Sequence, residues 1–438
     1  GLDPVHLAVV VRHERDLVVA HVDDVAIELG VTALIADQDD VKGTGRAVQC
    51  GLAGLPDDLT GTVVITYGDV PLQTTETLRA LVEAHVEHAG AVTVVTAEPA
   101  DPFGYGRVLR DESGQVIEIV EEKDCTDEQR AIREINGGIF ACDAAVLRAM
   151  LDQVDTSNAQ GEVYLTDVVG LAHRSGHRVG AVAVDDLWQT EGVNTRRQLA
   201  ALGQELNRRV LDYWMSEGVE VIDPGATWVD VTVTLAPDVR LLPGVQLHGA
   251  TVVAEGASIG PDTTLSDVQV GEGASVVRTH GVGAVLGAGC SVGPFAYLRP
   301  GTVVGRVAKI GTFVETKQAV LAEGAKVPHL SYVGDADIGP GTNIGAGTIF
   351  ANYDGVSKHR THVGAEARTG ANNTFVAPVS IGDGAVTGGG TVVRRDVPPG
   401  ALAVSTGPQR HIEDWVERKR PGSAAAEAAK AAQEESQQ

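Results

Sequence analysis

The feature that most constrains this chain is a six-residue repeat that runs from about residue 245 to about residue 393. An apolar residue recurs at most sixth positions, and glycine often follows it directly. The repeating positions include Val292, Leu298, Val304 and Ile310, then Ile338, Ile344 and Phe350, and then Phe375, Ile381, Thr387 and Val393. Helices are excluded here, because they would require apolar residues three and four apart. The repeat predicts a parallel β-helix, in which short strands alternate with tight turns and the apolar side chains stack in a narrow prism.

Composition and charge limit the function. Glycine makes up 53 of the 438 residues, about 12% against about 7% in typical proteins, which supports the repeat. The formal charge is −25, from 34 basic and 59 acidic residues. This balance argues against a protein that binds nucleic acid or anionic membranes, since neither is attracted to an acidic surface. Small phosphate-bearing molecules remain possible, because they need only a local cluster of lysine and arginine.

The cysteines and the apolar runs indicate the compartment. Cys50, Cys125, Cys142 and Cys290 are far apart and form no C-x-x-C pair, so we expect buried or free thiols in a reducing compartment. No apolar run is long enough to span a membrane, and the N-terminus has no signal-peptide pattern. We expect a soluble, cytoplasmic protein.

The region before the repeat has a different pattern. Short β-branched runs at residues 7–11, 63–66, 92–96 and 182–184 alternate with helix-like stretches, which predicts an α/β domain with a largely parallel sheet. Apolar residues from Leu199 to Tyr213 then recur at intervals of three and four, and Gly218 ends the predicted helix. We therefore expect an α/β domain over residues 1–193, a linker helix over 194–221, a β-helix over 222–406 and a tail over 407–438. The low-complexity end of the tail, from about Pro421, is predicted to be disordered.

Several motifs of the α/β domain suggest a ligand site. Residues 38–48 read Q-D-D-V-K-G-T-G-R-A-V, and a G-T-G turn before a helix offers backbone N–H groups to an anion or a nucleobase. Asp69 follows an apolar strand, at the sheet edge where α/β folds bind ligands and metals. Taken singly, the first motif is equally consistent with a capped turn and the second with a solvated turn.

The repeat is interrupted where it could have continued. The interruptions read P-F-A-Y-L-R-P at 294–300, F-V-E-T-K-Q at 313–318, V-P-H-L-S-Y-V-G at 327–334, D-A-D-I-G at 335–339 and N-Y-D-G-V-S-K at 352–358. The last segment breaks the apolar spacing between Phe350 and Val363, so we expect a loop that leaves the rod. His329 is a candidate general base, because the pKa of an imidazole lies near neutral pH. Arg299, Lys317 and Lys358 are candidate phosphate ligands. A surface histidine without function is the alternative for His329 alone.

In their order, these segments resemble a known family. Q-x4-G-T-G-x-A, G-D-x-P-L, F-G-Y-G-R, N-x-G, G-V-N and the interruptions of the rod are similar to the bifunctional bacterial N-acetylglucosamine-1-phosphate uridylyltransferase / glucosamine-1-phosphate N-acetyltransferase. The resemblance implies a Rossmann-like nucleotidyltransferase domain followed by a left-handed β-helix of hexapeptide repeats. It also implies a homotrimer with acetyltransferase sites between subunits. The expected activity converts acetyl-CoA, UTP, glucosamine-1-phosphate and N-acetylglucosamine-1-phosphate to UDP-N-acetylglucosamine for peptidoglycan synthesis.

The same resemblance implies roles for individual residues. His329 would be the acetyl-transfer base, and Mg²⁺ would bind Asp69 and Asn194. The sugar phosphate of the rod would contact Arg299, Lys317, Tyr332, Asn343 and Lys358. Acetyl-CoA would contact Ala346, Asn352, Tyr353, Ala371 and Gly389. The sugar nucleotide of the α/β domain would contact Gln38, Gly43, Thr44, Tyr67, Gly68, Asp69, Gly106, Glu121, Asn136 and Asn194.

This sequence also departs from the family's pattern. Ala371 stands where serine is usual, and Gly389 stands where alanine is usual; the first change removes one hydrogen bond, worth about 1 kcal/mol. The family's L-A-A-G-x-G-T-R-M loop and P-K pair are not among these residues. We therefore interpret the α/β domain as truncated at its front and expect these 438 residues alone not to transfer uridylyl. The alternatives are the full bifunctional enzyme represented by part of its chain and a non-catalytic trimeric rod that binds sugar nucleotides.

Overall fold

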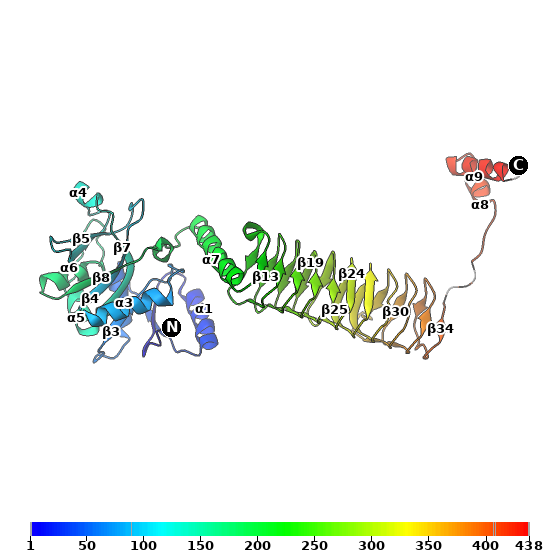
Figure 1. Ribbon diagram of the computed structural model, residues 1–438, viewed down its shortest axis with the longest axis horizontal. Coiled ribbons are helices and arrows are strands. Elements are labelled where there is room, and N and C mark those ends of the chain that lie inside the picture. Colours follow the sequence, from blue (N-terminus) through cyan, green and yellow to red (C-terminus); the bar gives the residue numbers. More distant parts are fainter. Residues whose placement is uncertain (1, 89, 406, 408, 437–438) are drawn as a thin grey trace. The chain divides into compact units, whose positions relative to one another are not determined.

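The computed structural model describes residues 2–88, 90–405, 407 and 409–436. It separates into two compact units, Gly1–Leu206 and Asn207–Gln438. The first unit is built from alternating strands and helices, and the second is a rod of short strands followed by two terminal helices (Figure 1). None of the described helices is both long and apolar enough to cross a membrane.

The first unit forms an α/β fold. Its elements are β1 (Ala8–Val11), α1 (Arg15–Leu29), β2 (Leu34–Asp37), α2 (Thr44–Ala53), β3 (Thr62–Ile65), α3 (Thr75–Glu87), β4 (Val92–Ala97), β5 (Arg107–Arg110), β6 (Val116–Val120), α4 (Asp127–Arg130), β7 (Ile135–Asp143), α5 (Ala144–Leu151), α6 (Asp167–Arg174), β8 (Val179–Ala183) and the 3₁₀ turn η1 (Leu187–Thr190). The apolar runs that predicted strands correspond to β1, β3, β4 and β8.

The direction of the strands differs from the prediction. Strand β7 is central, and it pairs antiparallel with β3, β4 and β5, while β5 pairs antiparallel with β6. Among the described pairings of this unit, only β4 with β8 and β1 with β2 are parallel. The expectation of a largely parallel sheet was therefore wrong. Short apolar runs show that a strand is buried, but they do not encode the direction of its neighbour.

The second unit is a parallel β-helix. Its strands are β9 (Glu220–Val221), β10 (Trp228–Val229), β11 (Thr234–Leu235), β12 (Arg240–Leu241), β13 (Gln246–His248), β14 (Val252–Val253), β15 (Ser258–Ile259), β16 (Thr264–Ser266), β17 (Gln269–Val270), β18 (Ser275–Val276), β19 (Thr279–Val282), β20 (Val285–Leu286), β21 (Ser291–Val292), β22 (Ala296–Leu298), β23 (Val303–Val304), β24 (Lys309–Thr312), β25 (Glu315–Leu321), β26 (Lys326–His329), β27 (Tyr332–Ile338), β28 (Ile349–Ala351), β29 (Thr361–Val363), β30 (Thr374–Val376), β31 (Val379–Ile381), β32 (Val386–Thr387), β33 (Val392–Val393) and β34 (Leu402–Ala403), with the 3₁₀ turn η2 (Pro224–Ala226).

Successive turns of the rod pair in parallel and bury the repeating residues. Ser291 pairs with Lys309, which is 18 residues later, and Lys309 pairs with Lys326, which is 17 residues later. Three six-residue sides therefore make one turn. Val292, Ile310, Ile344 and Phe375 are each at most 2% exposed, and they belong to one continuous core. This confirms the parallel β-helix predicted from the repeat.

One insertion lengthens a turn of the rod. Ile349 pairs with Thr374, which is 25 residues later instead of 17 or 18. The extra residues form a hairpin-like loop that is closed by a bridge between Tyr353 and Lys358. Val356 at its tip is 89% exposed. The loop predicted from the broken spacing is therefore present.

Helices flank the rod in sequence. The helix expected after Asn194 is α7 (Arg196–Ser216), and the chain turns at Gly218, which has a φ of 92°. The tail contains α8 (Trp415–Lys419) and α9 (Ala424–Glu435), and α9 lies in the segment from Pro421 for which disorder was predicted. Alanine, glutamate and lysine favour helices, and the Ser423 side chain caps α9 by accepting a hydrogen bond from the Ala426 N–H.

Candidate active sites

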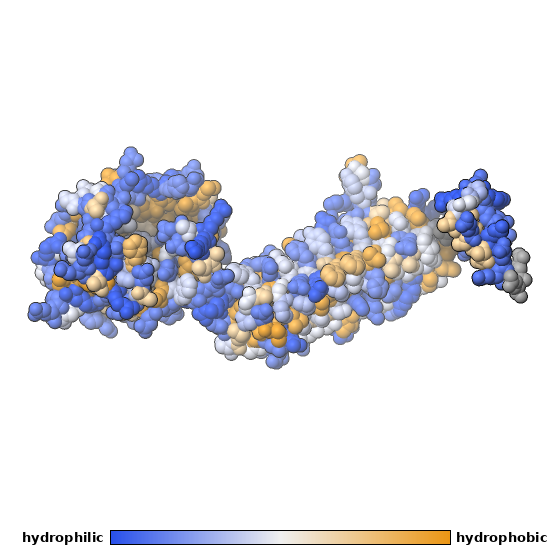
Figure 2. All heavy atoms as spheres, turned by 90° about the horizontal axis from the view of Figure 1, so that it is seen from above, coloured by the Kyte–Doolittle hydropathy of each residue, from blue (hydrophilic) through white to orange (hydrophobic). Residues whose placement is uncertain are grey.

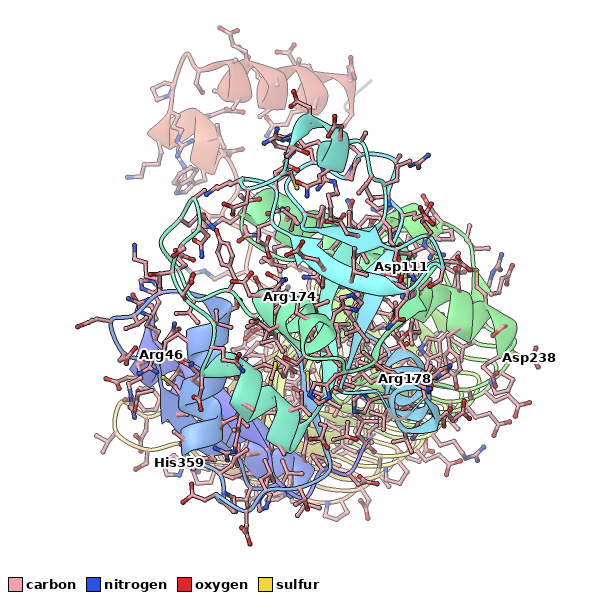
Figure 3. All side chains as sticks on the ribbon, turned by 90° about the vertical axis from the view of Figure 1, so that its left-hand side faces the viewer. Arg46, Asp111, Arg174, Arg178, Asp238 and His359 are labelled. Carbon is pink, nitrogen blue, oxygen red and sulfur yellow. The ribbon has the colours of Figure 1, made fainter. Side chains whose placement is uncertain are left out.

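The loop before α2 is held rigidly in the first unit. Gln38 donates hydrogen bonds from Nε2 to the carbonyls of Val41 and Gly43, at 3.0 and 3.1 Å. Gly43 has a φ of 118°, and a Cβ there would lie 2.1 Å from the carbonyl oxygen of Val163. Only glycine fits this position. Arg46 of α2 (Figure 3) donates from Nε to Asp39 at 3.1 Å and fixes the other side of the loop.

Tyr67 connects this loop with the sheet. Its hydroxyl shares a hydrogen bond with Thr44, and burial raises the pKa of Tyr67 to about 12. A Cβ on Gly138 would lie 2.6 Å from the Tyr67 ring, so the ring packs on the glycine backbone. The Thr44 hydroxyl also accepts a hydrogen bond from the Leu165 N–H at 3.2 Å. The structure thus brings Gln38, Gly43, Thr44 and Tyr67 together, with Gly68 following in the chain.

A second group of predicted residues surrounds Glu121. A Cβ on Gly106 would lie 3.4 Å from the Glu121 carboxylate, and the Gly106 carbonyl accepts from the Asn136 N–H at 2.9 Å. The Asn136 side chain accepts from the Gly138 N–H at 3.0 Å. Burial raises the pKa of Glu121, although Thr166 donates a hydrogen bond to its carboxylate at 2.9 Å. Gly106, Glu121 and Asn136 are therefore neighbours.

The two predicted magnesium ligands lie on either side of Gly192. A Cβ on Gly192 would be 3.7 Å from the Asp69 carboxylate and 3.9 Å from the Asn194 amide nitrogen. The Val193 N–H donates to the Asp69 carbonyl at 2.8 Å, which ties the two segments together. A half-turn of the Asn194 amide would present its oxygen instead. Two oxygen donors fit Mg²⁺, which takes its remaining ligands from water and substrate phosphates.

Sequence analysis missed several residues of this unit. Thr166 and Asp167 follow an apolar run at the start of α6 and were not singled out, yet Thr166 contacts Glu121. Burial raises the pKa of Asp167 to about 6, and the nearby Asp155 and Glu121 add to the shift. Tyr105 shares a hydrogen bond with Glu191, and burial raises the pKa of Tyr105. Tyr105 stands in the F-G-Y-G-R motif and Glu191 directly precedes the G-V-N motif, which was the available signal.

In the rod, four predicted residues occupy one column. The Gly347 N–H donates to the His329 carbonyl at 3.2 Å, and the Asn372 N–H donates to the Ala346 carbonyl at 2.7 Å. The Gly390 N–H donates to the Ala371 carbonyl at 2.8 Å, which continues the same ladder. His329, Ala346, Ala371 and Gly389 therefore hold equivalent positions on four successive turns. Asn343 is half-buried three residues before Ala346. The column leads from an exposed imidazole along the axis of the rod.

The predicted cations gather on neighbouring turns. The Arg299 N–H donates to the Thr316 carbonyl at 2.9 Å, so Arg299 and Lys317 occupy equivalent positions on adjacent turns. The Arg299 guanidinium pairs with Glu315 at 3.0 Å. Contact with Lys317 and its charge lower the pKa of Lys358, and the nearby Asp335 carboxylate offsets this shift only in part. A phosphate group would suit the space between the two ammonium groups.

Asp335 joins the cations to the inserted loop. Its carboxylate lies 3.7 Å from the Lys317 ammonium and accepts a hydrogen bond from Asn352, whose amide also reaches the Tyr332 hydroxyl at 3.3 Å. The loop residue Tyr353 is 60% exposed. Within the part of the chain that the structure describes, no side-chain hydrogen bond or ion pair links His329 to this group. The single chain thus assembles the cations and the column separately.

Comparisons with known proteins agree with this arrangement. Residues 5–231 match the nucleotidyl transferase family. The chain is 59% identical to the bifunctional protein GlmU of Micrococcus luteus over 99% of this chain and 89% of that protein. It is also 59% identical to GlmU of Pseudarthrobacter chlorophenolicus, over 99% of this chain and 87% of that protein. A nucleoside-diphosphate-sugar pyrophosphorylase from Vibrio cholerae aligns with a TM-score of 0.35 and 14% identity, over 44% of this chain and 79% of that one, which is too distant to support an argument.

An α/β nucleotidyltransferase domain joined to a parallel β-helix defines a two-part transferase. The chain belongs to the family of the bifunctional GlmU proteins. It is an enzyme with N-acetylglucosamine-1-phosphate uridylyltransferase and glucosamine-1-phosphate N-acetyltransferase activity, and its product is UDP-N-acetylglucosamine. The non-catalytic rod weighed as an alternative is not favoured.

Proposed function

We propose that His329 is the general base of acetyl transfer, with acetyl-CoA as the donor. The amine lone pair of glucosamine-1-phosphate attacks the thioester carbonyl, the C–N bond forms and the C–S bond breaks. His329 takes the proton that the amine loses and returns it to the leaving sulfur, so coenzyme A departs as its thiol. The observation that carries this proposal is the column that begins at exposed His329 and continues through Ala346 and Ala371 to Gly389.

The cationic group would bind the sugar phosphate. Lys317 and Lys358 are in contact, and Arg299 lies one turn earlier, so three positive charges are available to one phosphate. Tyr332 and Asn343 supply polar contacts for the sugar. Asn352 and Tyr353, on the inserted loop, would contact acetyl-CoA together with the column.

In the first unit, Asp69 and Asn194 would hold Mg²⁺, which would neutralise charge on the phosphates of UTP. Gln38, Gly43 and Thr44 would bind the uracil, and Tyr67 and Gly68 would border the nucleotide. Gly106, Glu121 and Asn136 would bind the N-acetylglucosamine. The support for these roles is that each group is assembled by direct contacts. We expected these 438 residues alone not to transfer uridylyl, whereas the GlmU relatives support uridylyltransferase activity for this enzyme.

We further propose that the protein works in the cytoplasm as a homotrimer. Apolar residues gather on the visible face of the rod in Figure 2. Phe295 and Phe313 stack at 5.4 Å along one corner and, like Leu330, are at least 50% exposed. An exposed apolar ridge of this kind favours an interface between subunits. Leu330 adjoins His329, so a partner subunit on this ridge would lie beside the base.

The test is the release of coenzyme A thiol from acetyl-CoA in the presence of glucosamine-1-phosphate. His329→Ala should lower turnover by about 10²- to 10⁴-fold, the usual contribution of a general base. His248→Ala is the matched control, because His248 is also a histidine of the rod but pairs with Asp230, away from the column. An unchanged rate in a folded His329→Ala enzyme would remove this histidine from the mechanism.

A further inference from the structure

The D-A-D-I-G segment contributes two carboxylates that the proposed chemistry does not use. Asp335 and Asp337 belong to β27, on the turn directly before the inserted loop. Asp335 has a φ of 47°, in the left-handed region that residues other than glycine rarely adopt. The same left-handed conformation recurs at corners of the rod, for example at Gln318 on the preceding turn (φ 47°), so it places Asp335 at a corner of the repeat.

Asp335 anchors the beginning of the loop. Its side chain is 17% exposed, and its carboxylate accepts a hydrogen bond from Asn352, the residue at which the loop leaves the rod. The same carboxylate lies 3.7 Å from the Lys317 ammonium. One residue thus ties the start of the loop to a proposed phosphate ligand.

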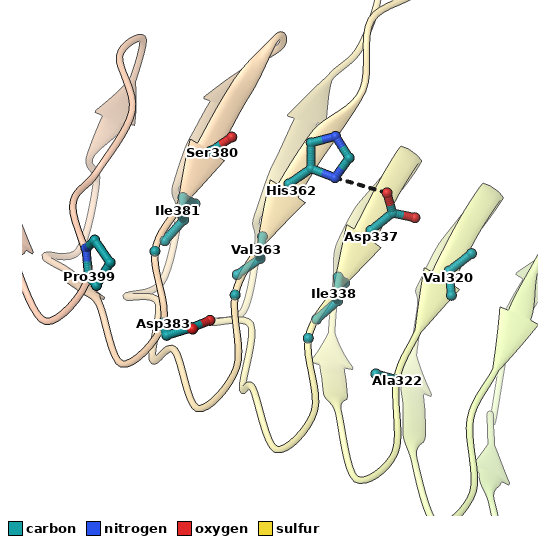
Figure 4. A pocket seen from close by; sticks show the side chains of 13 residues that line it. Val320, Ala322, Asp337, Ile338, His362, Val363, Ser380, Ile381, Asp383 and Pro399 are labelled. Atoms are coloured by element: carbon teal, nitrogen blue, oxygen red, sulfur yellow. Dashed lines mark ion pairs between the residues drawn. The ribbon is translucent and has the colours of Figure 1, made fainter.

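Asp337 anchors the end of the loop. Arg360 donates from Nε to the Asp337 carboxylate at 2.6 Å, and a second guanidinium nitrogen bonds to the other carboxylate oxygen. The guanidinium also donates to the carbonyls of Gln318 and Ala336, at 3.1 and 3.2 Å. His362 also pairs with Asp337, at 2.9 Å (Figure 4). Arg360 follows Lys358 by two residues, so the contact between Arg360 and Asp337 lies close in sequence to Lys358.

Between its anchors the loop is rigid. The Asp354 carboxylate accepts from the Val356 and Ser357 N–H groups at 2.8 and 2.7 Å and pairs with His359 at 2.7 Å. The His359 N–H donates to the Asn352 carbonyl at 2.8 Å. A loop that keeps its own shape can still pivot on its ends. The two anchors therefore decide where the Lys358 ammonium lies relative to Lys317.

We propose that Asp335 and Asp337 are positioning residues for acetyl transfer, which together clamp both ends of the inserted loop and set the distance between Lys358 and Lys317. This inference rests on the proposed role of the two lysines in binding the sugar phosphate. Neither aspartate is proposed to touch the substrate. They act by holding the loop, and displacement of a binding group by about 1 Å is enough to weaken a site strongly.

The test compares the full-length variants Asp335→Asn, Asp337→Asn, Arg360→Gln and the double variant Asp337→Asn/Arg360→Gln. In each, the KM for glucosamine-1-phosphate should rise by about tenfold, while the KM for acetyl-CoA changes by less than about twofold. The double variant should be no worse than its worse single variant, because both changes open the same anchor. Arg306→Gln is the control, since the Arg306–Glu323 pair is an exposed ion pair of the rod outside both groups.

Hydrogen exchange of the loop gives a second readout that does not depend on activity. The His359 N–H, which donates to Asn352 at the base of the loop, should exchange faster in the anchor variants, while the rest of the rod keeps its protection. Arg360→Lys, which keeps the charge but not the two-pronged contact, should show an intermediate effect. Unchanged KM values with unchanged loop exchange would overturn the clamp. If the unaltered protein released no thiol, the proposed function would fail, and the exchange data would still decide whether the anchors hold the loop.

Discussion

At the scale of single residues, a group of positive charges stands out in a protein that is acidic as a whole. The chain carries a formal charge of −25, yet Arg299, Lys317 and Lys358 gather on neighbouring turns of one rod. Two lysines in contact are unfavourable unless an anion joins them. The Asp335 carboxylate beside Lys317 supplies part of that negative charge, and the sugar phosphate of the proposed function would supply the rest.

Removal of these cations should affect one substrate selectively. Arg299→Ala and Lys358→Ala should each raise the KM for glucosamine-1-phosphate by about tenfold, equivalent to about 1.4 kcal/mol, because a charge-assisted contact to the phosphate is lost. The KM for acetyl-CoA should change much less. Steady-state kinetics with each substrate varied in turn provide the measurement. Equal effects on both KM values would show that the cations bind the other ligand.

At the scale of single elements, the start of α6 contains a carboxyl that is costly to ionise. Burial raises the pKa of Asp167 from 3.8 to about 6, with Asp155 and Glu121 adding to the shift. The folded state therefore holds this proton more tightly than the unfolded state does. Stability from this group is present at pH 4 and is lost as the pH rises through 6.

Asp167→Asn should consequently raise the Tm of the first unit at pH 8 and leave it nearly unchanged at pH 4, because asparagine cannot ionise. Thermal unfolding at the two pH values, followed by circular dichroism, measures this effect. Asp111→Asn is a control of opposite sign, because hydrogen bonds from Ser113 and Gln115 lower the pKa of Asp111. If the Tm gain of Asp167→Asn were equal at pH 4 and pH 8, ionisation would not be its cause.

The same scale shows how far the sequence could predict the fold. The rod was predictable because each turn requires apolar residues at the same spacing. The spacing of Val292 and Ile310 in the sequence therefore predicts that they stack. Strand direction in the first unit was not predictable, because the pairing of β3 with β7 joins residues about eighty positions apart. The segment of α9 has a composition that is simple enough to predict disorder and also rich in residues that favour helix, so composition alone does not decide between the two.

Some residues of the candidate sites could not be predicted from the sequence. Motif order predicted Lys317, Lys358 and Asn352, but nothing local indicated that Asp335 joins them. That role depends on an unusual backbone conformation and on contacts between turns about 17 residues apart. Such contacts follow from the register of the strands, and that register can be assigned only when the position of the inserted loop in the rod is known.

At the scale of the whole molecule, the two proposed sites lie in separate compact units with separate cores. Asp69→Asn should weaken Mg²⁺-dependent binding of UDP-N-acetylglucosamine, measured by calorimetry, because a metal ligand is lost. Thiol release by the rod should continue at its normal rate in this variant and in the presence of a chelator. His329→Ala should show the converse pattern. Loss of thiol release on chelation would mean that the rod also depends on a metal.

The column that begins at His329 places equivalent residues at regular distances along the rod. Each turn of a parallel β-helix advances by about 4.8 Å, so the three steps from His329 through Ala346 and Ala371 to Gly389 span about 14 Å. The length of the column is therefore a whole number of turns, because backbone hydrogen bonds fix the distance between successive turns. Deletion of one complete turn would preserve the fold and shorten the column by one turn, about 4.8 Å. The reach of a ligand along this surface is thus set by the number of repeats.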